Sequence, residues 1–593
     1  MLRRSIALIL AAASMCSLAL SEADTTPPLE RTSAAVGFIE SQLALFDHRL
    51  YVFRDFNDGV NIFTQKAFMG NNYLNIPEME EYAQGVSGIS GIKARLNFDN
   101  HTWGGYMFLN GGLTAGSSNP IPDLGYLPDG YDLTGASKLV FWARGETGSE
   151  SVEFFMGTLD QGPYPDTSEL RTTRYITLSK DWQQYEIDLT VADLSRINNG
   201  FGWVTSANYN MGSTEVVFYM DEIYYEFPDK QSPMLLLQSY ESAGIETDEY
   251  IINNVAYTYD NAMSLMALCY AGKLDRAKQI ADALVFVVHN DRDHNDGRIR
   301  NAYSSGNPCS FPNWYSKDGT QFARMPGFYD IEAREWYEDR YTQETSVGNA
   351  AWLVLGLMEA YRSIGDVVYF ETAQIIGDFI LTFQSETGGF TGGYEDWNST
   401  PITYKSTEHN IDLISAFALL ANASEGTKKL EYQAASDYAK AFVLSMYDSE
   451  LACFYTGTTL DGVTISKSVL PLDPNTWAVL AMPDFPDRER VMEFVESNMR
   501  LGEGYDFNDD RDGIWFEGTA QCAVVYHILG NNERSDAILS YLLENMAADG
   551  SITSADRDMV STGFEWFYGK RTHIGATAWV AFAELGRNPF EVY

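Results

Sequence analysis

Acidic side chains recur in this chain at the points where helices are predicted to begin. Each lies in a polar or aromatic cluster that opens a run of small and apolar residues with helical spacing. An acid at a helix start usually accepts backbone N–H bonds, and that capping role explains any one of them alone. Two such acids around one hollow would also support general acid–base chemistry, with one carboxyl protonated and the other ionised. The candidate catalytic residues are Glu344, Glu408, Glu517, Asp260 and Asp473.

Aromatic and amide side chains stand beside these acids, and capping does not explain them. Aromatic rings offer flat apolar faces, and amides both donate and accept hydrogen bonds, so together they suit a ring-shaped ligand with many hydroxyl groups. One candidate, Trp336, belongs to the long segment 291–341, which we expect to wall the site because long loops are uncommon unless they are functional. The candidate substrate-binding residues are Tyr257, Tyr259, Asn349, Trp352, His409, Asn410, Asn475, Trp477, Trp515 and Trp336.

The elements that must position these residues follow from the apolar period, which is helical from about residue 235 to the end. Six times a cluster of this kind opens a helix rich in small residues, and in five cases an amphipathic helix clearly follows. Such repetition is typical of stacked helical hairpins. Alternating inner and outer helices predict a closed, all-α (α/α)6 toroid over residues 235–593, with the inner helices starting at one shared mouth.

The segment before the helices, residues 30–230, alternates apolar and polar side chains between clusters of Gly, Asn, Asp and Pro. This pattern predicts an antiparallel β-sandwich. Its opening, Phe53 to Gly59, and its ending, Phe218 to Tyr225, resemble the first and last strands of the galactose-binding-like jelly rolls that serve as carbohydrate-binding modules. In that family a structural calcium often joins those strands, which implies Asp55 and Asp221 as metal ligands here, and carboxylate oxygens suit calcium.

The helical region, from its six cluster-opened repeats, resembles the six-hairpin glycosidase superfamily of (α/α)6 barrels. The resemblance implies the fold and the reaction class, but it supplies no catalytic pair residue by residue. We therefore expect a glycoside hydrolase that acts on a neutral poly- or oligosaccharide with two carboxyl groups. In a ring of six repeats, residues three repeats apart face each other, which pairs Glu344 with Glu517 and Asp260 with Asp473. A gap across the mouth leaves room for a water molecule, which favours inversion at the anomeric carbon.

Three other functions stay open from the sequence. A sugar epimerase could use His409 and His573, which stand in the third and sixth openings and would face each other. A polysaccharide lyase would need a tyrosine or histidine base and a group that neutralises a uronate, for which Tyr568, His573 and Arg571 are candidates. A glycan-binding protein without catalytic activity could use the same scaffold.

Charge and targeting signals limit the partners. The formal net charge is −42 at pH 7, from 82 acidic and 40 basic residues, which disfavours nucleic acid and anionic membranes. Residues 1–23 have the basic start and apolar run of a signal peptide, so we expect a secreted or periplasmic protein. No nucleotide-binding or nucleophile motif appears in the sequence, so we expect no catalytic cofactor. We also expect a monomer without a membrane partner.

Overall fold

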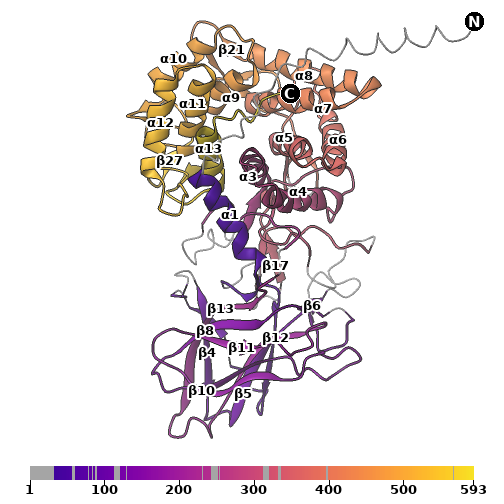
Figure 1. The fold of residues 1–593 in the computed structure, drawn as a ribbon, viewed down its shortest axis with the longest axis vertical. Helices are drawn as coiled ribbons and strands as arrows, with labels where there is room; N and C mark the ends of the chain where they lie inside the picture. Colours follow the sequence, from indigo (N-terminus) through magenta and orange to yellow (C-terminus); the bar gives the residue numbers. More distant parts are fainter. Residues whose placement is uncertain are drawn as a thin grey trace, which may run out of the picture.

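The structure is a computed structural model, and Figure 1 shows a β-domain and a helical domain joined end to end. It describes residues 33–593 except 56–60, 78, 83, 87–89, 113–120, 129, 230, 231, 242–251, 253, 311–318, 331–334, 396, 397 and 565. The predicted signal peptide lies outside the described residues. The division into an antiparallel β-domain and a helical domain confirms the fold-class prediction at that level. None of the described helices combines the length and the apolar character that crossing a bilayer requires.

The β-domain consists of two antiparallel sheets packed face to face. Their inner faces alternate with outer ones along each strand, so Leu139, Phe141 and Ala143 point into the core from one strand. The first sheet has the order β11-β8-β13-β4-β3 with β1 on β13: β1 (Arg49–Phe53), β3 (Met79–Tyr82), β4 (Gly91–Asn97), β8 (Lys138–Gly145), β11 (Gln183–Asp188) and β13 (Glu215–Glu226). The second has the order β10-β9-β12-β5-β2: β2 (Gln65–Gly70), β5 (Trp103–Leu109), β9 (Ser151–Met156), β10 (Arg171–Thr177) and β12 (Asn199–Ser206).

Asp55, two residues after β1, and Asp221, within β13, are the residues for which calcium was predicted, and both are buried. The Ser90 backbone N–H donates to Asp55 Oδ1 over 3.2 Å, and the Val86 N–H donates to Asp221 Oδ2 over 2.5 Å. Both acids therefore hold the loop that leads into β4. Calcium binding by these two carboxyl groups stays a prediction.

Among the described residues, six inner helices contact one another in chain order, and the last contacts the first. Small residues on their facing sides allow this close approach: an added Cβ at Gly356 would lie 3.2 Å from the Ala262 carbonyl oxygen. The six helices are α3 (Thr258–Tyr270), α5 (Val347–Ile364), α7 (Thr407–Ala423), α9 (Asp473–Ala481), α11 (Phe516–Ile528) and α13 (Ile574–Leu585). We call this arrangement the inner ring.

Outer helices follow the inner ones and pack against them. They are α4 (Leu274–His289), α6 (Val367–Leu381), α8 (Gly426–Ser445), α10 (Arg488–Asn498) and α12 (Asn532–Asn545). The connections between helices carry the turn η1 (Tyr341–Gln343) and the short strands β14 (Val255–Tyr257), β15 (Ala302–Ser304), β16 (Gly327–Asp330), β17 (Glu335–Glu338), β18 (Thr345–Ser346), β19 (Gly393–Glu395), β20 (Thr400–Ile402), β21 (Tyr447–Asp448), β22 (Cys453–Phe454), β23 (Gly457–Thr458), β24 (Ile465–Ser466), β25 (Arg500–Leu501), β26 (Gly504–Tyr505), β27 (Val560–Ser561) and β28 (Phe567–Tyr568). In the β-domain, β6 (Gly111–Gly112) pairs with β7 (Ile121–Pro122).

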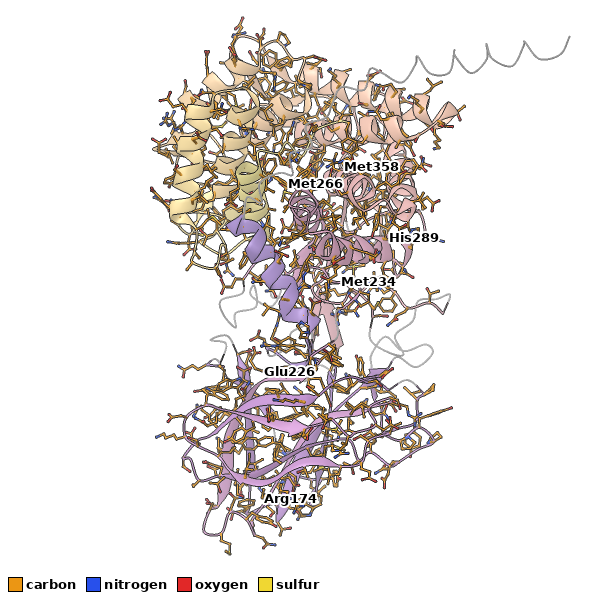
Figure 2. All side chains as sticks on the ribbon, in the orientation of Figure 1. Arg174, Glu226, Met234, Met266, His289 and Met358 are labelled. Carbon is orange, nitrogen blue, oxygen red and sulfur yellow. The ribbon has the colours of Figure 1, made fainter. Side chains whose placement is uncertain are left out.

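The helix α1 (Ala34–Asp47) precedes the β-domain in sequence but packs on α13 of the inner ring. Ile39 and Leu43 are fully buried in the core of the helical domain, in the same continuous cluster as Met266 and Met358 (Figure 2). Its start is fixed by Ser33, whose hydroxyl donates to Glu584 over 2.5 Å, and its end by Asp47, which accepts from Gln279 over 2.7 Å. The range 30–230 predicted for the β-domain thus includes one helix that belongs to the other domain.

We expect Leu43→Ala to lower the free energy of unfolding of the helical domain by about 2 to 5 kcal/mol, because it leaves a cavity under α1. Leu45→Ala on the same helix is the matched control, since that side chain is 43% exposed and its loss should cost about 0.5 kcal/mol or less. Urea denaturation of the full chain measures both. Equal effects of the two substitutions would contradict the placement of α1 in this core.

Candidate active site

A cavity of about 540 Å³ opens where the inner helices begin. Every helix of the inner ring contributes a residue from its first turns or from the position just before it. The cavity is lined by Tyr240, Tyr257, Tyr259, Asp260, Tyr341, Gly348, Asn349, Trp352, Glu408, His409, Asp412, Asp473, Trp477, Phe507, Trp515, Glu517, Trp566, Tyr568 and His573. The residues come from positions 240 to 573, so chain segments far apart in sequence build one site.

Most of the predicted site residues are brought together in this cavity. The predicted catalytic residues that line it are Asp260, Glu408, Asp473 and Glu517, and the predicted substrate-binding residues that line it are Tyr257, Tyr259, Asn349, Trp352, His409, Trp477 and Trp515. Glu344, Asn410 and Asn475 do not line it. The side chain of Trp336 lies outside the described residues.

Local geometry and hydrogen bonds keep Glu344 and the two asparagines out of the cavity lining. Glu344 ends the turn η1, three residues before α5 begins, and it lies near Tyr341 rather than on the helix face that meets the cavity. Asn410 donates from Nδ2 to the carbonyl of Ser406 and accepts the Phe390 N–H over 2.8 Å. Asn475 makes the same pair of bonds, to the Pro471 carbonyl and from the Phe454 N–H. Each of these two amides therefore joins a neighbouring loop to the start of its own helix by hydrogen bonds.

Glu517, at the start of α11, is held by two neighbours. The Tyr259 hydroxyl donates to Glu517 Oε1 over 2.6 Å and itself accepts the Trp579 indole N–H over 2.9 Å. His573 Nδ1 lies 3.7 Å from Glu517 Oε2. Burial raises the pKa of Glu517 to about 7, although His573 and Tyr259 act in the opposite direction. The carboxyl is therefore fixed in position and close to its point of titration at neutral pH.

His573 joins Glu517 to Asp260. Its Nε2 lies 3.4 Å from Asp260 Oδ1, and its ring stacks on Tyr240 with the centroids 4.2 Å apart. Burial alone would lower the pKa of His573, but Asp260 and Glu517 outweigh it and raise that pKa. An added Cβ at Gly575 would lie 2.5 Å from Asp260 Oδ1, so the helix start needs glycine there.

A second group of acids faces the cavity from α7 and α9. Burial raises the pKa of Glu408 to about 7, and the charge of Glu517 adds to this increase. Burial, Glu408 and Glu517 also raise the pKa of Asp473, against the Gln521 amide that donates to its Oδ1 over 2.8 Å. Asp412, one helical turn after Glu408, is 1% exposed, and its pKa is raised by burial, Glu408 and Asp473. Three carboxyl groups thus share one wall.

His409 lies on the same wall in a different charge state. Burial lowers the pKa of this imidazole to about 4, so it is neutral at physiological pH. An added Cβ at Gly348 would lie 2.4 Å from its Cδ2, so glycine at the start of α5 makes room for the ring. The cavity therefore contains one neutral histidine and one whose pKa is raised.

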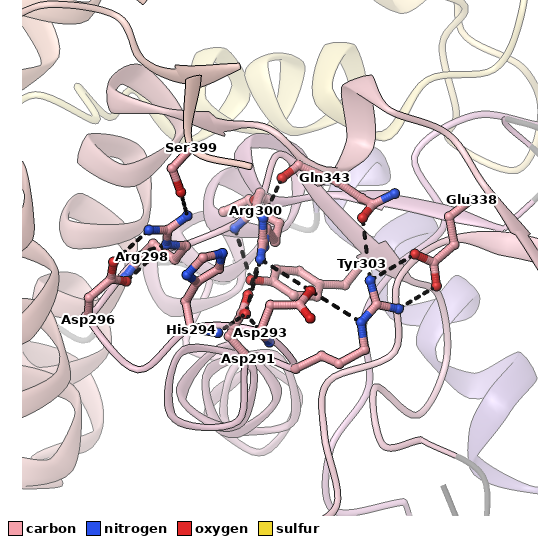
Figure 3. A network of polar contacts seen from close by, with 12 residues as sticks. Asp291, Asp293, His294, Asp296, Arg298, Arg300, Tyr303, Glu338, Gln343 and Ser399 are labelled. Carbon is pink, nitrogen blue, oxygen red and sulfur yellow. Dashed lines mark hydrogen bonds and ion pairs between the residues drawn. The ribbon is translucent and has the colours of Figure 1, made fainter. Parts of the chain in front are cut away.

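A buried ion-pair network holds the wall between α4 and α5 (Figure 3). Arg300 pairs with Asp291 over 2.7 Å and donates to the Gln343 carbonyl over 2.8 Å. The next residue, Asn301, donates to the Tyr341 carbonyl over 3.0 Å and accepts from the Asn349 amide over 2.8 Å. The network thereby fixes Tyr341 and Asn349 at the cavity, which is the role expected of the segment 291–341.

Sequence reasoning missed several residues of the lining. Asp412 carried a usable signal, because it follows Glu408 by four positions and so shares its helix face. Tyr240, Phe507 and Trp566 lie in connections without periodicity, and no signal identified them. His573 and Tyr568 entered only through the rival functions.

The chain was compared with known proteins. No family model and no curated protein matches it. Solved structures similar to it include a wild-type glycosidase with 11% identity and a TM-score of 0.42, over 59% of this chain and 91% of the other. A novel alpha-amylase from Clostridium perfringens has 8% identity and a TM-score of 0.40, over 56% and 87%. The cellobiose 2-epimerase from Bacillus thermoamylovorans has 11% identity and a TM-score of 0.42, over 59% and 92%.

The raised pKa of Glu408 predicts a pH-dependent cost in stability. A carboxyl whose pKa is higher in the folded state than in the unfolded state destabilises the fold increasingly as pH rises between the two values. Glu408→Gln should therefore raise the free energy of unfolding by up to roughly 3 kcal/mol at pH 8 and change it little at pH 4.

Urea denaturation at the two pH values measures this difference. Glu425→Gln is the matched control, because Glu425 is exposed at the start of α8. A Glu408→Gln variant that is no more stable than the wild type at pH 8 would show that Glu408 carries no such burial cost.

Proposed function

We propose that this chain is an exported glycoside hydrolase. Its inner and outer helices would form an (α/α)6 toroid of the six-hairpin glycosidase type, and its β-domain a jelly roll that binds sugar. The substrate would be a poly- or oligosaccharide without anionic groups, for which neutral sugars are the class expected from the sequence. One observation carries the proposal: Glu408 and Glu517, from α7 and α11, line one aromatic cavity, and the pKa of each is raised to about 7.

Glu408 suits the role of general acid. Its pKa near 7 keeps it partly protonated at neutral pH, and proton transfer is most effective when the pKa of the acid lies near the working pH. It would donate this proton to the glycosidic oxygen while the bond from that oxygen to the anomeric carbon breaks. The adjacent charge of Glu517 favours the protonated form of Glu408 and so supports this assignment.

Glu517 suits the role of general base. The Tyr259 hydroxyl fixes one of its oxygens, and His573, whose pKa is raised, lies beside the other. Both neighbours favour the ionised form. The carboxylate would take a proton from a water molecule as that water attacks the anomeric carbon from the opposite face, which inverts the configuration. Asp260 acts through His573, whose charge it stabilises, and is a positioning residue in this mechanism.

The aromatic lining supports a sugar as the ligand. Trp515 stacks on Tyr568 with centroids 5.3 Å apart. Trp566, 47% exposed, meets the Tyr568 ring edge to face with centroids 4.9 Å apart. Rings arranged in this way offer faces against which the apolar C–H faces of sugar rings stack. A row that leads outward from a cavity suits a ligand longer than one sugar unit.

One observation favours a second candidate function, a sugar epimerase. His409 and His573 line the same cavity, and burial lowers the pKa of the first while two acids raise that of the second. A neutral imidazole and a protonated one could remove and return a proton at a carbon next to a carbonyl group. Such an enzyme would convert free disaccharides into epimers without cleaving them.

Substitution of either proposed catalytic acid should stop hydrolysis. We expect Glu408→Gln and Glu517→Gln each to lower kcat by roughly a thousandfold or more, because one loses the proton donor and the other the base. Glu344→Gln should lower it far less, since Glu344 does not line the cavity. Reducing-end release from neutral glucans, mannans and galactans gives the rates, and proton NMR gives the anomeric form.

The products distinguish the competing functions. Cleavage with inversion supports the proposed hydrolase. Epimers of intact disaccharides, lost in His409→Asn, would replace it with the epimerase. Unsaturated products that absorb in the ultraviolet would indicate a lyase, and binding without any product a glycan-binding protein.

The raised pKa values also predict the pH profile. Activity requires Glu408 protonated and Glu517 ionised, so the pair must hold one proton. The rate should therefore be bell-shaped with its maximum near pH 7, falling by about tenfold per pH unit on either side. Initial rates from pH 4 to pH 10 measure the profile, and a rate that stays constant from pH 7 to pH 9 would exclude Glu408 as the acid.

A further inference from the structure

The charges that line the cavity are strongly unbalanced. Five carboxyl groups face it, and among its described lining residues there is no lysine or arginine. His573 lies within 4 Å of Asp260 and Glu517, so these two acids have a cationic neighbour. Glu408, Asp412 and Asp473 make no ion pair with any described residue. The wall formed by α7 and α9 is thus acidic without a protein cation to balance it.

Asp412 shows the imbalance most clearly. It is 1% exposed, it belongs to the cavity lining, and neither of its carboxyl oxygens has a hydrogen-bond partner of ordinary geometry among the described residues. The Trp352 indole N–H interacts with this carboxyl group and favours its ionised form, although the contact lacks ordinary hydrogen-bond geometry. A buried carboxyl group with so weak a partner costs free energy, so native proteins seldom keep one unless a ligand or a function uses it. Asp473 interacts electrostatically with Asp412, and among the described residues its side chain accepts one hydrogen bond, from the Gln521 amide.

The rest of the lining favours a cation attached to a flat ring. Ten of the lining residues are aromatic: Tyr240, Tyr257, Tyr259, Tyr341, Trp352, Trp477, Phe507, Trp515, Trp566 and Tyr568. Aromatic faces attract ammonium groups as well as the apolar faces of sugars. A linear polyamine would satisfy the acids but would leave most of the stacking surface unused.

We propose that the sugar bound in this cavity carries a protonated amino group, which binds beside Asp473 with Asp412 behind it. The substrate class is then an amino-sugar glycan with free amines, such as a chain of 2-amino-2-deoxy-hexose units. This inference rests on the proposed function, because it takes the ligand to be a glycan. Among the glycans without anionic groups, it selects those that carry free amino groups. Without a ligand, burial favours the protonated forms of Asp412 and Asp473, and the ammonium group would favour their ionised forms and pair with them. Glu408 and Glu517 would act on the glycosidic bond.

The charge of the whole molecule agrees with this substrate. With a formal net charge of −42, the protein attracts a polycation from a distance and repels an anionic glycan. This attraction acts through solvent and is screened by salt. Association with an amino-sugar polymer should therefore weaken as ionic strength rises, and association with an uncharged polymer should not.

Binding of three matched sugars to the full chain tests the proposal. Glucosamine, N-acetylglucosamine and glucose differ only in the group at C2, and only the first is cationic at pH 6. Calorimetry should show glucosamine binding roughly tenfold tighter than the other two. Spermidine serves as a cation without a sugar ring. Equal binding of the three sugars, or spermidine binding as tightly as glucosamine, would overturn the proposal.

Aspartate-to-asparagine variants, which remove a carboxyl group and keep the shape of the side chain, test where the ammonium group binds. Asp473→Asn and Asp412→Asn should each remove most of the preference for glucosamine over glucose. Asp461→Asn, on an exposed loop, is the matched control and should keep the preference. A preference that survives in both site variants would overturn the proposal, and intact folding of each variant is checked by its denaturation curve.

Hydrolysis separates this inference from the proposed function. Oligomers of glucosamine, N-acetylglucosamine and glucose with the same linkage are offered to the wild type. Cleavage of the uncharged oligomers alone would overturn the amino-sugar inference and leave the hydrolase in place. Tight binding of glucosamine with no cleavage of any glycan would overturn the hydrolase and leave the ammonium site in place.

Discussion

Closure of the inner ring is the constraint on which the rest of this structure depends. Six helices that contact each other in order must all start near one another, and their starts leave backbone N–H groups without partners inside the helix. Each start also carries the positive end of a helix dipole, which favours acidic groups nearby. The cavity is therefore a consequence of the packing of the helices, and its acids, such as Asp260, Asp473 and Glu517, occupy the first turns where such groups are least costly.

The electrostatics of the site show what this packing costs. Burial raises the pKa of Glu408 and Glu517 to about 7, which means that their ionised forms destabilise the fold at neutral pH. His573 offsets part of the cost for Glu517, whereas Asp412 has no such neighbour. Groups held at a free-energy cost are typical of functional sites, because selection for folding alone would replace them. The same buried carboxyl groups therefore connect the stability of the fold, the pH dependence of the reaction and the class of ligand proposed for the cavity.

The sequence predicted the parts of the structure that repeat and missed those that depend on a single contact. Helical period and cluster openings were enough to place Glu408 and Glu517 in one cavity. They failed for Glu344, because the opening cluster extends three residues before α5 and only its later residues reach the helix face. They failed for Asn410 in a different way: an amide beside a site acid can point back to its own loop, and no pattern in the chain distinguishes the two directions.

The position of α1 shows why chain order was the hardest feature to predict. Among the described residues, five inner helices of the ring pack against the outer helix that follows each of them in sequence, whereas α13 packs against α1 from the other side of the β-domain. Ser33 and Glu584, which bond across this junction, are 551 positions apart. Closing a loop of such length has an entropic cost that the contacts at this junction must offset. His573 precedes α13 directly, and Asp260 and Glu517 lie on the helices to either side, so the acid–histidine core of the site is complete only when this last junction has formed.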